Sequence, residues 1–176
     1  MTPEKAYYHA CKYGPSVGTR ITASQNTLFS IWYAIDVDMG PHEDTRKGAC
    51  QTPTAAFKYA EDIDKGPHED TRKGACRRYE WGYAYAEKID RGPHEDTRKA
   101  ACQNEEYALK YAMHIDKCAH EDTRKAACKN SKYAYLYMIN IDKSFNKDTW
   151  EAVKEDILFK TIYKEFFHQI SKELII

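Results

Sequence analysis

Four segments of the chain pair a histidine with a cysteine at the same spacing, so these residues are the first candidates for metal binding or nucleophilic catalysis. In each segment the cysteine follows the histidine by eight residues, as in His42–Cys50, His68–Cys76, His94–Cys102 and His120–Cys128. Eight residues span more than two helical turns, about 12 Å, whereas zinc needs its ligands within about 2.3 Å of one point. We therefore predict no metal, no other cofactor and no catalytic residue, since four copies of one poor nucleophile pair are not typical of an enzyme.

Arginine and aspartate each recur at equivalent positions along the chain, and each such set of positions is called a column. The two columns suit either an ion-pair ladder or an anion-binding stripe. We expect each aspartate to pair with an arginine of its own or a neighbouring unit, or to cap the next helix. The alternative is that the arginines grip phosphates or an acidic partner, but glutamate and aspartate precede the arginine in all four identical segments. The columns are Arg20, Arg46, Arg72, Arg98 and Arg124, and Asp38, Asp64, Asp90, Asp116 and Asp142.

A column of tyrosines offers a second route to nucleic-acid binding, because aromatic rings can stack on single-stranded bases. A helical wheel places these rings beside alanine and isoleucine, so we expect them at the edge of the core with the hydroxyl hydrogen-bonded. The column is Tyr33, Tyr59, Tyr85, Tyr111 and Tyr137.

All these columns share one period. The four cysteines stand 26 residues apart, and the segment before each reads HEDTRKGA or HEDTRKAA. A fixed step of this length is typical of an array in which one small unit stacks on copies of itself. We predict a single repeat domain over 1–176, with five full units over 19–148, an atypical N-terminal half-unit over 1–18 and a C-terminal capping helix over 149–176.

Each unit contains two helix patterns. The first covers Pro93–Cys102 in one copy, where we expect the proline in the first turn and the small residues packed against neighbours. Because Gly48 occupies the place of Ala100, we expect Gly48→Ala to be neutral or stabilising. The second pattern covers Asn104–Asp116, begins at an N-capping asparagine and ends, in the middle linkers, at a Gly-Pro break.

These patterns predict an all-α fold, a right-handed α-solenoid of about five helix-turn-helix repeats. The tail keeps helical spacing from Trp150 to Leu174 through Ile170. We expect it to form one long helix, or two in line, that closes the end of the stack.

The composition excludes several classes of protein. The 27 basic and 27 acidic residues cancel, which argues against a bulk polyanion binder. A hydrophobic content of 42% argues against disorder. No apolar run is long enough to span a bilayer and the N-terminus lacks a signal-peptide core, so we expect a cytoplasmic protein with reduced thiols and no membrane partner.

The opposite arc of the second helix varies from unit to unit, and we predict that it binds a partner. In the first and last units this arc is apolar, where the chain's own ends, a partner or self-association would cover it. The predicted binding residues are Trp32, Lys58, Asp62, Lys88, Lys110, His114, Leu136 and Asn140.

The short helix pattern followed by Asn104–Ala112, which reads NEEYALKYA, resembles the tandem helical repeats of the DUF4116 type. It also resembles short two-helix repeat proteins of large tailed bacteriophages, and the resemblance covers about 19–148. It implies an all-helical repeat fold and no established catalysis.

Together these observations predict a non-enzymatic helical-repeat scaffold that binds another protein, a host factor if the chain is phage-encoded. The alternative is a single-stranded nucleic-acid-binding repeat protein that uses the arginine and tyrosine columns.

Overall fold

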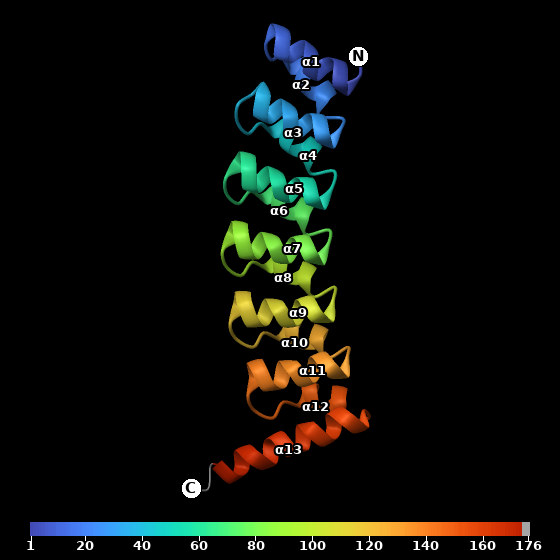
Figure 1. The fold of residues 1–176 in the computed structure, drawn as a ribbon, viewed down its shortest axis with the longest axis vertical. Coiled ribbons are helices and arrows are strands. Elements are labelled where there is room, and N and C mark those ends of the chain that lie inside the picture. The colour runs from blue at the N-terminus through green and yellow to red at the C-terminus, as the bar shows by residue number, and fades with distance from the viewer. Residues whose placement is uncertain (174–176) are drawn as a thin grey trace. The chain divides into compact units, whose positions relative to one another are not determined.

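The computed structural model describes residues 1–173, with side chains up to His168, and the regular secondary structure of this part is helical (Figure 1). No residue of 1–173 lies in a strand. Helix pairs recur along the chain and pack against their neighbours, which confirms the predicted α-solenoid of helical repeats. The handedness of the solenoid stays a prediction.

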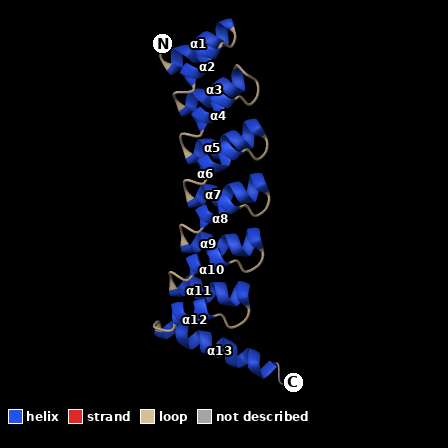
Figure 2. Ribbon diagram, turned by 180° about the vertical axis from the view of Figure 1, so that it is seen from behind, coloured by secondary structure: helices blue, strands red, loops and turns tan. Residues whose placement is uncertain are grey.

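Short helices of seven residues alternate with longer helical segments, four of which combine a seven-residue α-helix with a π-helical turn (Figure 2). The short helices are α2 (Val17–Ala23), α4 (Glu43–Ala49), α6 (Glu69–Ala75), α8 (Glu95–Ala101), α10 (Glu121–Ala127) and α12 (Lys147–Val153). The long helices are α1 (Pro3–Tyr13), α3 (Thr27–Asp36), α5 (Pro53–Tyr59), α7 (Tyr79–Tyr85), α9 (Glu105–Tyr111), α11 (Ser131–Tyr137) and α13 (Ile157–Glu173). Four of them continue into a π-helical turn, which is η1 (Ala60–Asp64), η2 (Ala86–Asp90), η3 (Ala112–Asp116) or η4 (Met138–Asp142).

The helices group into two compact units, Met1–Thr97 and Arg98–Ile176, which divide inside α8. In the first unit, α2 packs against α1, α3 and α4, and the long helix α5 packs against α3 and α7. In the second unit, α11 packs against α9, α10, α12 and α13. Each unit is therefore a stack in which a helix contacts the pairs before and after its own.

The short helices α4, α6, α8 and α10 begin two residues later than expected, because histidine is their N-cap. The ring Nδ1 of His42 accepts a hydrogen bond from the backbone N–H of Asp44 at 3.2 Å, and His68 and His120 cap in the same way. Pro41 therefore precedes the cap, and the prediction of a proline in the first helical turn is wrong. The imidazole nitrogen supplies the acceptor that serine or asparagine supplies at most N-caps.

Five of the long helices, α3, α5, α7, α9 and α11, end near a residue in the left-handed conformation that is not a glycine. Lys65, Arg91, Lys117 and Lys143 have φ angles of 51–56°, and Met39 has 53°. The next residue then donates back into the helix, as Gly66 N–H does to the Ala60 carbonyl at 3.1 Å. Glycine normally takes this position because a Cβ there costs about 1 kcal/mol, so four basic side chains occupy it at some strain.

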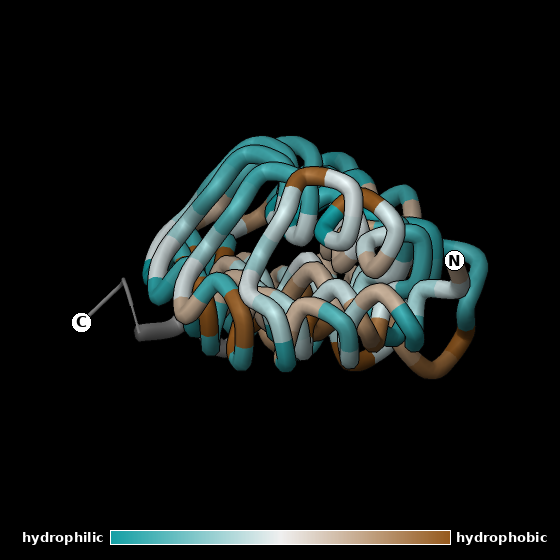
Figure 3. Tube along the Cα trace, turned by 90° about the horizontal axis from the view of Figure 1, so that it is seen from above, coloured by the Kyte–Doolittle hydropathy of each residue, from teal (hydrophilic) through white to brown (hydrophobic). Residues whose placement is uncertain are grey.

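The interior of each compact unit consists of small clusters made of alanines and one or two large side chains. One cluster holds Ala56, Ala60, Ala75 and Phe57 around the ring of Tyr85. Alanine lets the helices approach closely, and tyrosine fills the remaining space between them. Figure 3 shows hydrophilic and hydrophobic residues interspersed along the Cα trace.

The tail forms a further helix pair rather than one cap. A turn at residues 154–156 separates α12 from α13, and the two helices pack together. The Thr149 and Tyr163 hydroxyls lie 3.1 Å apart, repeating the 2.9 Å contact between Thr123 and Tyr137. The tail therefore adopts repeat geometry. Leu174 and the side chain of Ile170 lie outside the described residues.

Candidate functional site

The identical residues of the repeat build a hydrogen-bonded network between each short helix and the long helix that follows. The hydroxyl groups of Thr45 and Tyr59 lie 2.7 Å apart, and the backbone N–H of His42 donates to the Tyr59 hydroxyl at 3.0 Å. The same contacts join Thr71 to Tyr85 at 2.8 Å. All four of these side chains are fully buried, so each of these two repeats contains one polar contact that is shielded from water and satisfied.

Arginine and aspartate extend this network toward the surface. The Arg46 guanidinium donates through Nε and Nη2 to the Asp64 carboxylate, with the shortest contact at 2.7 Å, and lies 5.7 Å from the Tyr59 ring centroid. The hydrogen bond to Asp64 raises the pKa of Arg46. The same pair forms at the other four positions, always 18 residues apart and within one unit: Arg20–Asp38, Arg72–Asp90, Arg98–Asp116 and Arg124–Asp142.

This network removes the side chains that nucleic-acid binding would need. Tyr33, Tyr59, Tyr85, Tyr111 and Tyr137 are fully buried, so none offers a ring face to a base. The Arg46 side chain keeps only 12% of its surface and is already paired with a carboxylate. The tyrosine stacking platform is therefore excluded, and the arginine stripe would have to break its ion pairs to reach a phosphate.

The four cysteines of the repeat are half-buried thiols, whereas Cys11 and Cys118 are exposed. Cys50 lies 3.4 Å from the carbonyl oxygen of Asp70, to which its thiol donates, and burial raises its pKa to about 11. Burial raises the pKa of Cys76 and Cys128 to about 12. A thiol with such a pKa is almost entirely protonated at neutral pH and is a poor nucleophile. Over the described part of the chain, no three histidine, cysteine or acidic side chains converge as metal ligands would.

The residues predicted to bind a partner lie on the outer side of the long helices. Lys58, Asp62, Lys88, His114 and Asn140 are exposed, as is Trp32 at 37% of its surface. Lys110 and Leu136 are half-buried, Lys110 by an ion pair with Glu106 at 2.6 Å and Leu136 by packing near Leu109 and Tyr137. Their role in binding stays a prediction.

Two grooves of the first compact unit open beside this outer side, each where the end of one long helix meets that of the next. The first groove measures about 430 Å³ and is lined by Ala34, Ile35, Met39, Gly40, Pro41, Asp62, Ile63 and Lys65. The second groove measures about 520 Å³ and is lined by Ala60, Glu61, Lys65, Gly66, Pro67, Lys88, Ile89 and Arg91. Every residue of the second groove stands 26 positions after one of the first, so the two are the same feature in successive repeats.

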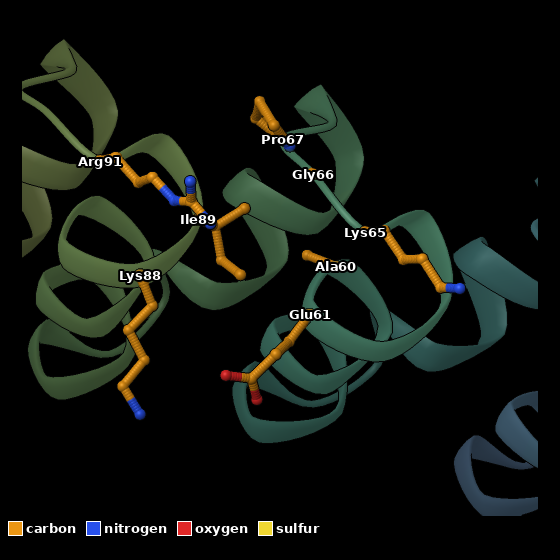
Figure 4. A pocket seen from close by; sticks show the side chains of 8 residues that line it. All are labelled: Ala60, Glu61, Lys65, Gly66, Pro67, Lys88, Ile89 and Arg91. Atoms are coloured by element: carbon orange, nitrogen blue, oxygen red, sulfur yellow. The ribbon is translucent and has the colours of Figure 1, made fainter.

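The left-handed basic residue forms one wall of each groove. In Figure 4 the Arg91 side chain reaches from its loop toward Ile89, whereas the Lys65 ammonium points away from this groove. Lys65 lines both grooves and holds in the first the position that Arg91 holds in the second. The sequence contained this column, Lys65, Arg91, Lys117 and Lys143, but the Gly-Pro after its first two members suggested only a helix break.

The apolar outer arcs of the first and last repeat units are covered unequally by the chain's own end segments. At the N-terminal end, α1 packs Tyr7 against Trp32 with ring centroids 5.8 Å apart, yet Ile35 stays 50% and Met39 85% exposed. At the C-terminal end, Ile139 packs into the cluster around Val153 and Tyr163. Cover by the chain's own segments is therefore partial at the first of these ends.

Comparison of the chain with family models, with curated proteins and with solved structures finds no match. The resemblance to DUF4116-type and phage repeats therefore stays a prediction. Among the described helices, none combines the length and the apolar character needed to cross a membrane.

Proposed function

We propose that the chain is a non-enzymatic helical-repeat scaffold that binds another protein through the outer side of its long helices. The observation that carries the proposal is the pair of grooves, which share a backbone shape and differ in their side chains. Repeat proteins commonly bind partners in this way, because the stacking residues fix the scaffold while other positions vary without cost to packing.

The distribution of side chains supports this division. The side chains that join the helices, threonine, tyrosine, arginine and aspartate, are the same in successive units. One outer position, by contrast, changes its residue type from unit to unit, as Trp32, Lys58, Ala84 and Lys110. A surface used only to keep the protein soluble would need polar residues but no grooves. If the chain is phage-encoded, we propose a host protein as the partner.

Site-specific photocrosslinking tests the proposal. A photoreactive amino acid is placed at Lys58, Asp62 or Lys88, and at Lys73 as the control on a short helix, where the side chain is exposed and paired with Glu69. In lysate of the source organism, we expect the three outer positions to crosslink one common protein and Lys73 to crosslink none of it. Crosslinking of that protein from Lys73 alone, or of no protein from any outer position, would overturn the proposal.

A further inference from the structure

The two grooves present different chemistry at equivalent positions. Ile35 and Met39 line the first groove where Glu61 and Lys65 line the second. The first groove therefore has an apolar wall, and its exposed Ile35 and Met39 lose water contact if a ligand covers them.

The second groove has an excess of positive charge. Its lining holds three basic residues, Lys65, Lys88 and Arg91, and one acidic residue, Glu61, although the Lys65 ammonium points away from the groove (Figure 4). None of the four takes part in an ion pair, and Lys88 is otherwise engaged only with the Phe57 ring, 5.8 Å from its centroid. Charges without protein partners in a concave site attract a ligand of opposite charge.

The backbone supports a binding role for the basic wall residue. Lys65 and Arg91 adopt φ angles of 55° and 54°, a conformation that glycine adopts without strain. Residues held in such conformations at the rim of a groove are more common in binding sites than elsewhere. The turn does not require a basic residue, since Met39 holds the equivalent position one repeat earlier with a φ angle of 53°.

We infer that the two grooves together bind an extended peptide segment that carries an apolar side chain and, about three residues away, acidic side chains. This inference rests on the proposed scaffold function and names the partner's chemistry. The apolar side chain occupies the first groove against Ile35 and Met39, and the carboxylates occupy the second between Lys88 and Arg91.

The spacing follows from the geometry of the stack. Successive packed helices lie about 8–10 Å apart, and an extended peptide advances about 3.3 Å per residue. Two grooves one repeat apart are therefore about three residues apart along such a peptide. A peptide whose apolar and acidic residues are adjacent cannot fill both grooves at once.

Fluorescence anisotropy with labelled synthetic peptides tests the inference. The probe is a glycine-serine peptide with a leucine and, three positions later, a pair of glutamates, made in both chain directions. One control peptide places the leucine beside the glutamates, and another replaces the glutamates with lysines. We expect the spaced acidic peptide, in one direction, to bind the full-length protein about tenfold more tightly than either control.

Matched variants locate the binding. Arg91→Glu and Ile35→Glu should each weaken binding of the spaced peptide about tenfold. Lys143→Glu is the control, because Lys143 has the same left-handed backbone conformation in the second compact unit and should leave affinity unchanged. Circular dichroism melts of all three variants verify that each remains folded.

Any of four results would overturn the inference. The first is equal binding of the spaced and adjacent peptides, and the second is an unchanged affinity in Arg91→Glu. The third is tighter binding of a single-stranded thymidine oligonucleotide with the same dependence on Arg91, which would assign the basic groove to nucleic acid. If no peptide binds while the photocrosslinks at Lys58, Asp62 and Lys88 persist, the peptide chemistry is wrong and the scaffold function stands.

Discussion

The inner network keeps the same side chains from repeat to repeat, whereas the outer grooves do not, although the same helices build both. Inside each unit, threonine, tyrosine, arginine and aspartate keep their identity and their distances from one repeat to the next. At the grooves, the backbone repeats but the side chains change from apolar to basic. The difference indicates that stability is concentrated on one side of the repeat and that the other side is free to vary.

Breaking the inner ion pair should have the largest effect. In Asp90→Ala, the Arg72 guanidinium loses its carboxylate while keeping only 14% of its surface. Removing one member of a largely buried ion pair costs about 3 kcal/mol or more. We expect a corresponding fall in the midpoint of urea-induced unfolding.

The matched control is Asp62→Ala, which removes an exposed aspartate from the same compact unit and should change stability by less than about 0.5 kcal/mol. The double variant Arg72→Met, Asp90→Leu should recover much of the loss, because it leaves no unpaired charge. Equal effects of Asp90→Ala and Asp62→Ala would contradict the contrast between the inner and outer sides.

The second prediction concerns the closest approach of short helices to their neighbours. A Cβ added at Gly48 would lie 2.0 Å from the Ser30 hydroxyl oxygen and 2.5 Å from the Ser24 backbone oxygen. The backbone atom cannot move aside cheaply, so Gly48→Ala should destabilise the protein by about 1–3 kcal/mol. The structure confirms a helix at Gly48 but reverses the effect expected from helix propensity alone.

Gly74→Ala provides the comparison in the next repeat. Its added Cβ would meet the Ala56 methyl group at 2.7 Å and Cys50 side-chain atoms at 3.3 Å, with no backbone atom among the nearest contacts. We expect a smaller loss, because the closest approach is longer than at Gly48, although the Ala56 methyl group is fixed to its backbone and the two helices must separate slightly. Differential scanning calorimetry of both variants should give a lower melting temperature for Gly48→Ala than for Gly74→Ala. The reverse order would contradict the packing argument.

The third prediction concerns the basic residues with a left-handed backbone at the ends of the long helices, which lie between the inner network and the grooves. Lys143→Gly should stabilise the protein by about 0.5–1 kcal/mol, because glycine adopts the positive φ angle of 51° without strain. Arg91→Gly should give a similar gain in stability and should also weaken binding of the spaced peptide. The control Asn140→Gly places glycine inside η4 and should cost about 1 kcal/mol in the same urea titration. A loss of stability in Lys143→Gly would show that the turn itself requires the side chain.

The sequence was sufficient for the features that depend on periodicity. A step of 26 residues identified the repeat, and the helical wheel placed Tyr59 and its equivalents on the buried face, where they are fully buried. It also associated the arginine column with the aspartate column. These features follow from which residues recur, without reference to coordinates.

Features that depend on local backbone geometry were not accessible in this way. Histidine as an N-cap and lysine at a left-handed helix end are uncommon uses of these residues, so propensity rules favoured proline and glycine instead. The tail pair was detectable, since Thr149 and Tyr163 continue their columns. It was missed because Trp150 and His168 stand where arginine and aspartate would continue theirs. The grooves require three dimensions, because each combines residues from two successive repeats.

The smallest effect on stability is expected at the grooves. Lys88→Glu removes only a cation–π contact with Phe57 at 5.8 Å, which is worth about 0.5 kcal/mol at an exposed position. Its melting temperature should therefore stay close to that of the parent protein, while affinity for the spaced acidic peptide falls. A matched substitution on a short helix, Lys73→Glu, should lose its ion pair with Glu69 at similarly low cost and leave peptide affinity unchanged. Measuring melting temperature and peptide affinity on both variants separates the two sides of the repeat, because only a groove residue should alter binding without altering stability.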